Sequence, residues 1–308
     1  TAVQTLEPIT WAEELIEPAR VADHPRLAFL YVIASLCYTT GRIEAAVGYS
    51  DAGQIVLVSS REAPPNGIEA WLGLVYLVIG QPERMAEVCR AQLARRRDTH
   101  VHIRAWLVAA LAMAGSGEEA MDSADGLIEA AEATGNPMFL GLALGAFGVA
   151  FRDADPVGAL NAHRRGLVIA QDSGNRVIAS VLAPFLAILE AEHGGTVSAF
   201  DHLTLAIRNY HNAGNTTTIR APLALLAALF DRLGRYEPAA TIAGFAASPL
   251  TATAAEFTTA IAHLRDILGE ATYESLARKG KTMTTAAIAT YAYDQIDQAR
   301  TELNAASK

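Results

Sequence analysis

Gly234-Arg235-Tyr236-Glu237-Pro238-Ala239 is one of six short segments in which a turn residue, usually Gly, is followed five positions later by a small or slim side chain. The last residues of these segments stand at positions 46, 85, 120, 159, 199 and 239, in steps of 39, 35, 39, 40 and 40. A nearly constant step of this size predicts a repeated supersecondary unit. The segments are Gly41–Ala46, Gly80–Met85, Gly115–Ala120, Ala154–Ala159, Gly194–Ala199 and Gly234–Ala239.

A second motif falls between these turns, as Gly135-Asn136-Pro137, Gly174-Asn175 and Gly214-Asn215. A Gly just past a helix can adopt the left-handed conformation that satisfies the last carbonyls, and the Asn side chain can cap the next helix. Pro137 suits the first helical position, where its missing N–H costs nothing. Each unit is therefore predicted to be a helix, a short turn, a second helix and a Gly-Asn stop.

The two helices of a unit differ in composition. First helices, such as residues 139–151 and 177–189, are apolar on nearly all sides, which predicts burial all round. Second helices, such as the one that starts at Pro82, carry an apolar stripe and a charged face, which predicts an outer layer. Gly141, Gly145 and Gly148 leave room for close approach of neighbouring helices.

This pattern predicts an all-α protein, a right-handed α-solenoid of helix pairs with a period of about 39–40 residues. Residues 1–25 are expected to form an N-terminal capping helix, kinked or ended by Pro18. Residues 26–246 hold the six helix pairs, and residues 247–308 form C-terminal capping helices, near 254–268, 270–279 and 284–303.

Composition limits the classes of function. The 308 residues are 51% hydrophobic and 19% charged, with a net charge of −9, which excludes disorder and disfavours direct nucleic-acid binding. The longest apolar stretches, 27–38, 138–151 and 177–189, are shorter than a membrane span needs. We see no signal peptide, so a cytoplasmic protein is expected, and the missing initiator Met favours a fragment of a longer chain.

Motifs for catalysis are weak. Gly280-Lys281-Thr282 matches the end of a phosphate-binding loop, but Ser275 stands where that loop requires Gly. His100 and His102 have the wrong spacing for a helical metal site. Asp155 before Pro156 is better explained as a helix cap than as a catalytic carboxylate. We therefore predict a non-enzymatic chain with no cofactor and no metal site.

Polar residues on first helices are the remaining candidates for a binding site. Glu69 and Arg104 share one register, because each stands eleven residues before the Gly that begins the next turn segment, Gly80 or Gly115. His102 and Arg220 are expected nearby on the inner face. They are predicted to line a concave groove. The alternative is a structural role in salt bridges, which is the commoner use of an inner Arg.

Two sets of residues carry a resemblance to known families. Ala133–Pro137 and Gly234–Ala240 resemble tetratricopeptide-type repeats, in the longer form found in signal-transduction ATPases of the maltose-activator kind. Ala206–Arg220, Leu233–Gly244 and Thr290–Arg300 resemble the tails of actinobacterial multidomain proteins that join an adenylyl or guanylyl cyclase domain, an ATPase domain and helical repeats. The catalytic residues of that family would lie upstream, so the resemblance assigns no functional residue here.

The resemblance implies a non-catalytic sensor or protein-interaction module of a larger signalling ATPase, cyclase or transcriptional regulator. Its partners would be the other domains of the parent chain and a small molecule or peptide in the groove, with no direct nucleic acid and no membrane. The alternative is a free-standing scaffold of the same repeats that binds a partner peptide or helix.

Overall fold

The computed structural model describes residues 7–59, 65–95, 100–193 and 195–306. Gly194 of the predicted fifth turn, and the outermost residues of both predicted capping segments, lie outside these ranges. Within them all regular structure is helical, which confirms the predicted all-α class. The chain forms two compact units, Thr1–Leu182 and Ala183–Lys308, which are described separately below.

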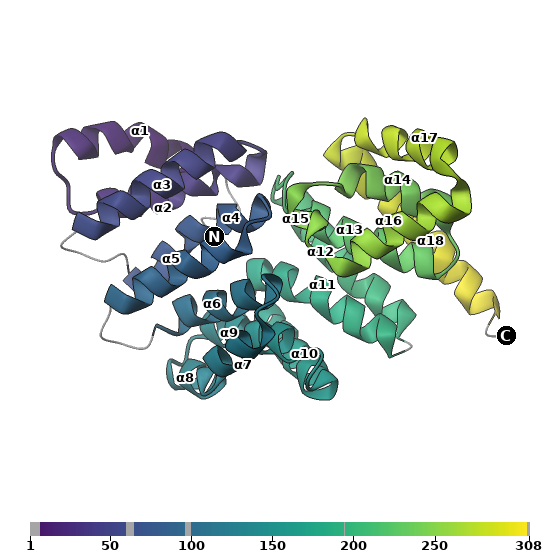
Figure 1. The fold of residues 1–308 in the computed structure, drawn as a ribbon, viewed down its shortest axis with the longest axis horizontal. Helices are drawn as coiled ribbons and strands as arrows, with labels where there is room; N and C mark the ends of the chain where they lie inside the picture. Colours follow the sequence, from purple (N-terminus) through teal and green to yellow (C-terminus); the bar gives the residue numbers. More distant parts are fainter. Residues whose placement is uncertain (1–6, 60–64, 96–99, 194, 307–308) are drawn as a thin grey trace. The chain divides into compact units, whose positions relative to one another are not determined.

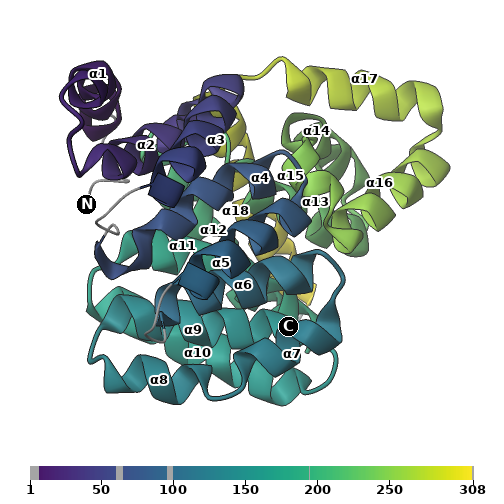
Figure 2. The same cartoon turned by 60° about the vertical axis from the view of Figure 1, so that its left-hand side comes forward.

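The described part of the first unit is a succession of helices (Figure 1). Figure 2 shows α1, α2 and α3 side by side, in agreement with their packing. The helices of this unit are α1 (Glu7–Val21), α2 (Leu27–Ser35), η2 (Leu36–Thr40), α3 (Ile43–Ser59), η3 (Pro65–Gly73), α4 (Leu74–Val78), α5 (Pro82–Arg95), α6 (Val101–Met113), α7 (Gly117–Ala124), α8 (Leu127–Ala133), α9 (Pro137–Ala150) and α10 (Pro156–Asp172). Helix α11 (Arg176–Glu192) begins in this unit and ends in the second.

The second unit continues the pattern of paired helices. Helix α13 packs against α14 and α16, and α14 packs against α17, so the predicted C-terminal segment adds another pair beside α13 and α14. Helix α18 packs against α12 and α14. The helices are α12 (Thr196–Asn212), α13 (Arg220–Arg232), α14 (Tyr236–Ala246), α15 (Pro249–Ala252), α16 (Ala255–Leu268), α17 (Glu270–Lys281) and α18 (Thr285–Ala306).

The Gly-Asn stops have the predicted geometry. Gly135, Gly174 and Gly214 have φ values of 63°, 67° and 66°, in the left-handed region. The Asn136 side chain accepts a hydrogen bond from the Met138 N–H at 3.0 Å, and Asn175 and Asn215 cap the following segments in the same way. Pro137 begins α9, and Asp155 caps α10 by accepting from the Gly158 N–H at 2.9 Å. These predictions are confirmed. Pro18 does not end α1, which runs on to Val21.

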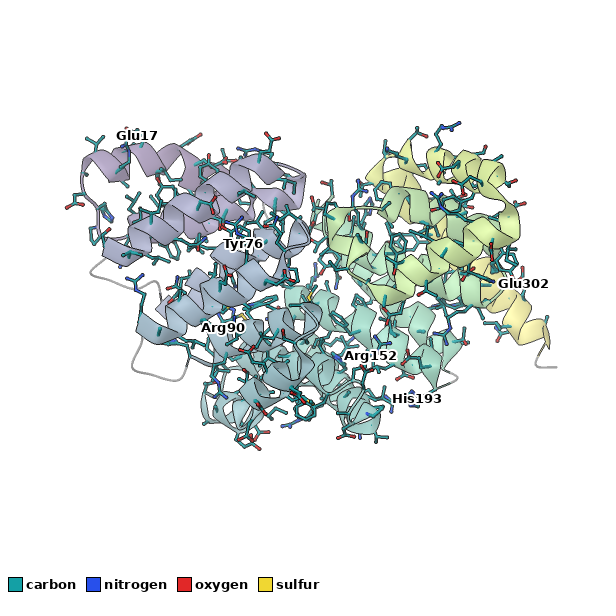
Figure 3. All side chains as sticks on the ribbon, viewed as in Figure 1. Glu17, Tyr76, Arg90, Arg152, His193 and Glu302 are labelled. Carbon is teal, nitrogen blue, oxygen red and sulfur yellow. The ribbon has the colours of Figure 1, made fainter. Side chains whose placement is uncertain are left out.

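First and second helices differ in burial in the first unit more than in the second. Half of α9 and most of α13 are buried, but so is most of α14, a second helix. The second helices of the first unit carry exposed charges and form ion pairs with each other: Arg84 with Asp51 at 3.1 Å, Arg90 with Glu119 at 2.5 Å and Arg165 with Glu132 at 2.5 Å. Figure 3 labels Arg90 of α5. Because these pairs are exposed, each adds at most about 1 kcal/mol.

Missing side chains allow paired helices to approach closely. A Cβ added to Gly141 would lie 2.9 Å from Ile178 of α11, and one on Gly166 of α10 would lie 3.4 Å from the Gly141 carbonyl oxygen. In the second unit, a Cβ on Gly280 of α17 would overlap the carbonyl oxygen of Thr241 of α14. Gly280 therefore belongs to a helix contact, inside α17, and does not belong to a phosphate-binding loop.

We predict that Gly280→Ala lowers the free energy of unfolding by about 3 kcal/mol, because the new methyl group must displace the backbone of α14. Gly48→Ala is the matched control: Gly48 lies in α3 with nothing near its added Cβ, and the change is expected to raise stability by about 0.5 to 1 kcal/mol. Urea unfolding monitored by circular dichroism measures both. Equal stability of Gly280→Ala and the parent protein would contradict the close packing.

His163 makes stability depend on pH. It is buried in α10, and desolvation, followed by the nearby charge of Arg152, lowers its pKa from 6.5 to about 4. Since the unfolded chain takes up a proton below about pH 6.5 and the folded protein does not, this stability is complete above that pH and is lost as the pH falls toward 4.

The loss attributable to His163 is expected to reach about 2 kcal/mol at about pH 5. Urea unfolding at two pH values should show a smaller difference for His163→Gln than for the parent protein. His24→Gln, at an exposed position, is the control and should leave the difference unchanged. An identical pH dependence for His163→Gln and the parent protein would refute the buried neutral state.

Candidate functional site

Three of the four residues predicted to line a groove lie in the first unit, and the fourth lies in the second. Glu69 is buried in η3, His102 is buried in α6, and Arg104 follows on α6. Arg220 begins α13 in the second unit. Their predicted role in ligand binding stays a prediction.

His102 lies at the centre of an aromatic cluster. Its Nε2 accepts hydrogen bonds from the indole N–H groups of Trp71 and Trp106, both at 3.2 Å. Its ring stacks on Phe139, with 5.5 Å between ring centroids. Because an indole nitrogen can only donate, Nε2 must be unprotonated and the ring proton must be on Nδ1. The cluster thus joins η3, α6 and α9.

Arg104 and Arg220 both donate to backbone carbonyls near the ends of other helices. Arg104 donates to the carbonyl oxygens of Ser123 at 3.3 Å, in the last turn of α7, and of Asp125 at 2.7 Å, just after that helix. Arg220 donates to the carbonyl oxygen of Phe245, at the end of α14, and burial lowers the pKa of its guanidinium. These positions suit the negative end of a helix dipole. In these contacts both arginines bind backbone carbonyl oxygens, whereas the structural role predicted for them was a salt bridge to a carboxylate.

The second unit contains a hollow of about 360 Å³ between α11, α13 and α16, with one further lining residue from α12, which we call the α13 hollow. Alanine side chains and a few larger apolar groups make up most of the lining, together with the charged residues Asp231, Arg232 and Glu256. The apolar lining comprises Ala187, Ile188, Ala191, Leu203, Leu225, Ala228, Leu229, Ala255 and Ala260, and Thr259 completes it.

Asp231 is the buried charge of this hollow. Its side chain is only 8% exposed, and the Nδ1 of His263 lies 2.8 Å and 3.0 Å from its two carboxylate oxygens. The ring of Tyr236 meets His263 edge-on at 5.8 Å between centroids. A carboxylate that is almost fully removed from water needs hydrogen-bond donors. Asp231 therefore offers a ligand in this apolar hollow one specific polar contact.

Sequence reasoning missed Asp231, although a signal was present. It stands three residues before Gly234, which begins the sixth turn segment, and the five equivalent residues in the other repeats are uncharged: Tyr38, Leu77, Ala112, Phe151 and Ala191. A carboxylate in an otherwise uncharged register marks a place where one repeat differs from the others.

The first unit has a wider and more polar hollow of about 520 Å³ between α7, α8 and α9. Asp122, Asp125 and Glu129 lie on it, together with the stacked rings of Phe147 and Phe151, whose centroids are 4.3 Å apart. The three carboxylates are exposed to solvent. This hollow therefore lacks the buried polar contact that distinguishes the α13 hollow.

The thiols are poor candidates for chemistry. Cys37 and Cys89 are both buried and unoxidised, and burial raises the pKa of both thiols, that of Cys37 to about 11. A thiol with a raised pKa carries little of the reactive thiolate at neutral pH. Among the described residues, no group of three or more His, Cys, Asp and Glu side chains is arranged to hold a metal ion.

The chain matches no family model and no curated protein. The resemblance to cyclase and ATPase tails stays a prediction. In the part of the chain that the structure describes, no helix has both the length and the apolar character needed to cross a bilayer.

Proposed function

We propose that this chain is a non-catalytic sensor and interaction module of a larger signalling ATPase, cyclase or transcriptional regulator, and that it binds its ligand on the face of its first helices. The observation that carries this proposal is the α13 hollow, a mostly apolar space with one buried carboxylate, bordered by three first helices. Pockets of this size and lining are the usual form of small-ligand sites.

The helix pairs support a solenoid as the underlying architecture. Each pair ends at a tight turn, and α6 and α13 pack both against their own second helices and against the first helix of the next pair. A stack of this kind, wound in the right-handed sense of tetratricopeptide-like repeats, presents its first helices on a concave face. The α13 hollow would then lie on that face.

Ligand binding in this position would act on the spacing of the repeats. The hollow is bordered by α11, α13 and α16, which belong to three successive helix pairs. A ligand that fits best at one spacing of these helices favours that spacing, and the favoured curvature would bias the other domains of the parent chain between two states. The free energy for this change comes only from the difference in affinity between the two states.

Hydrogen exchange tests the proposed sensor. Fractions of the small-molecule extract of the cells that make the protein are added to the chain, and amide exchange is followed by mass spectrometry. One fraction is expected to slow exchange in α11, α13 and α16 and also to change exchange in helices that do not line the hollow. Ala191→Phe, which fills the hollow from α11, is the control and should abolish the response.

The proposal fails if no fraction changes the exchange of any helix in the parent protein. It also fails if Ala191→Phe, shown to be folded by circular dichroism, responds as the parent does. A change limited to α11, α12, α13 and α16, whose residues line the hollow, would indicate a binding site without a sensor.

A further inference from the structure

We propose that the α13 hollow binds a small apolar molecule that carries a protonated amine, with the ammonium group donating to the carboxylate of Asp231. This inference rests on the proposed function only in taking the α13 hollow as the binding face. It names the chemical class of the ligand and the residue that recognises it.

The lining of the hollow determines the size and the apolar character of the ligand's body. Ile188 and Leu225 are half-buried, so each presents apolar surface that a ligand can cover. Leu229 and Ala228 are buried on the α13 side of the same space. With a volume of about 360 Å³, the hollow accommodates a compact body such as one aromatic ring with a short alkyl chain. Burial of such a body is favourable by roughly 25 cal/mol per Å² of apolar surface.

Asp231 determines the charge of the ligand's polar group. A carboxylate can accept about four hydrogen bonds, and the Nδ1 of His263 supplies one donor to it. The remaining acceptor capacity suits an ammonium group, which offers three donors and the opposite charge. At 8% exposure, Asp231 is poorly hydrated, and a charge-assisted hydrogen bond is stronger in such surroundings than in water.

The other charges of the hollow favour the same sign. Arg232 and Glu256 oppose each other in charge, so Asp231 leaves the lining with a net negative charge. The Arg232 guanidinium also lies 3.5 Å from the Ala191 carbonyl oxygen, at the end of α11. An apolar carboxylate ligand would place its charge beside that of Asp231, and like charges in a partly buried site repel. The geometry therefore favours an amine over an acid of the same shape.

Two probes of matched shape and opposite charge test this. The complete chain is titrated at about pH 7 with 4-phenylbutylamine and with 4-phenylbutyrate, and binding is followed by calorimetry. The amine is expected to bind at least about tenfold more tightly than the acid, which corresponds to one charge-assisted hydrogen bond. Because this comparison uses the unchanged protein, it does not depend on any variant folding.

Two variants locate the effect. Asp231→Asn keeps the shape and one acceptor oxygen but removes the charge, and it should weaken amine binding about tenfold or more. Asp266→Asn removes an exposed charge from α16, one of the helices beside the hollow, at a position outside the lining, and should change binding less than about twofold. Circular dichroism verifies that both variants are folded.

The assignment is overturned if the acid binds as tightly as the amine, if neither probe binds, or if folded Asp231→Asn binds the amine as the parent does. These outcomes differ from failure of the proposed sensor. If the amine binds through Asp231 but no extract fraction alters exchange beyond α11, α12, α13 and α16, the site stands and the sensor fails. If an extract fraction produces the wider change and the amine does not bind, the sensor stands and the ligand class is wrong.

Discussion

Close approach of helix backbones, made possible by missing side chains, is the constraint on which the rest of this structure depends. Gly280 of α17 lies so near the Thr241 carbonyl of α14 that even a methyl group would overlap it. Gly244 of α14 makes the same kind of contact with the backbone of Ala277 in α17. At such short distances, packing is specific, because any added atom must push a whole helix away.

The high content of alanine and glycine follows from this constraint and also explains the α13 hollow. Where small residues of two neighbouring helices face each other, the helix backbones come into contact. Where small residues of three helices border the same gap, their side chains are too short to fill it, and a hollow is left. Alanines from α11, α13 and α16 border the hollow. The apolar 51% of the chain thus serves mainly to bury first helices, while the charges that give the net −9 lie mostly on the second helices and the ends.

The helices, turns and caps could be predicted because they depend on neighbouring residues. The caps formed by Asn136 and Asp155 are read from residues within three positions of each other. The α13 hollow could not be predicted, because it depends on the packing of helices that start at residues 176, 220 and 255. For Arg104 and Arg220, the sequence indicated charge on an inner helix but could not reveal that the partners are carbonyls.

The central claim is that the α13 hollow holds an apolar amine against Asp231, and its most direct test is the position of the bound probe. Nuclear Overhauser effects between 4-phenylbutylamine and the methyl groups of the complete chain give that position. The account predicts contacts from the aromatic ring to Ile188, Leu225 and Leu229, which line the hollow. Contacts that fall instead on methyl groups outside the lining, such as those of the exposed Ile267, would contradict it.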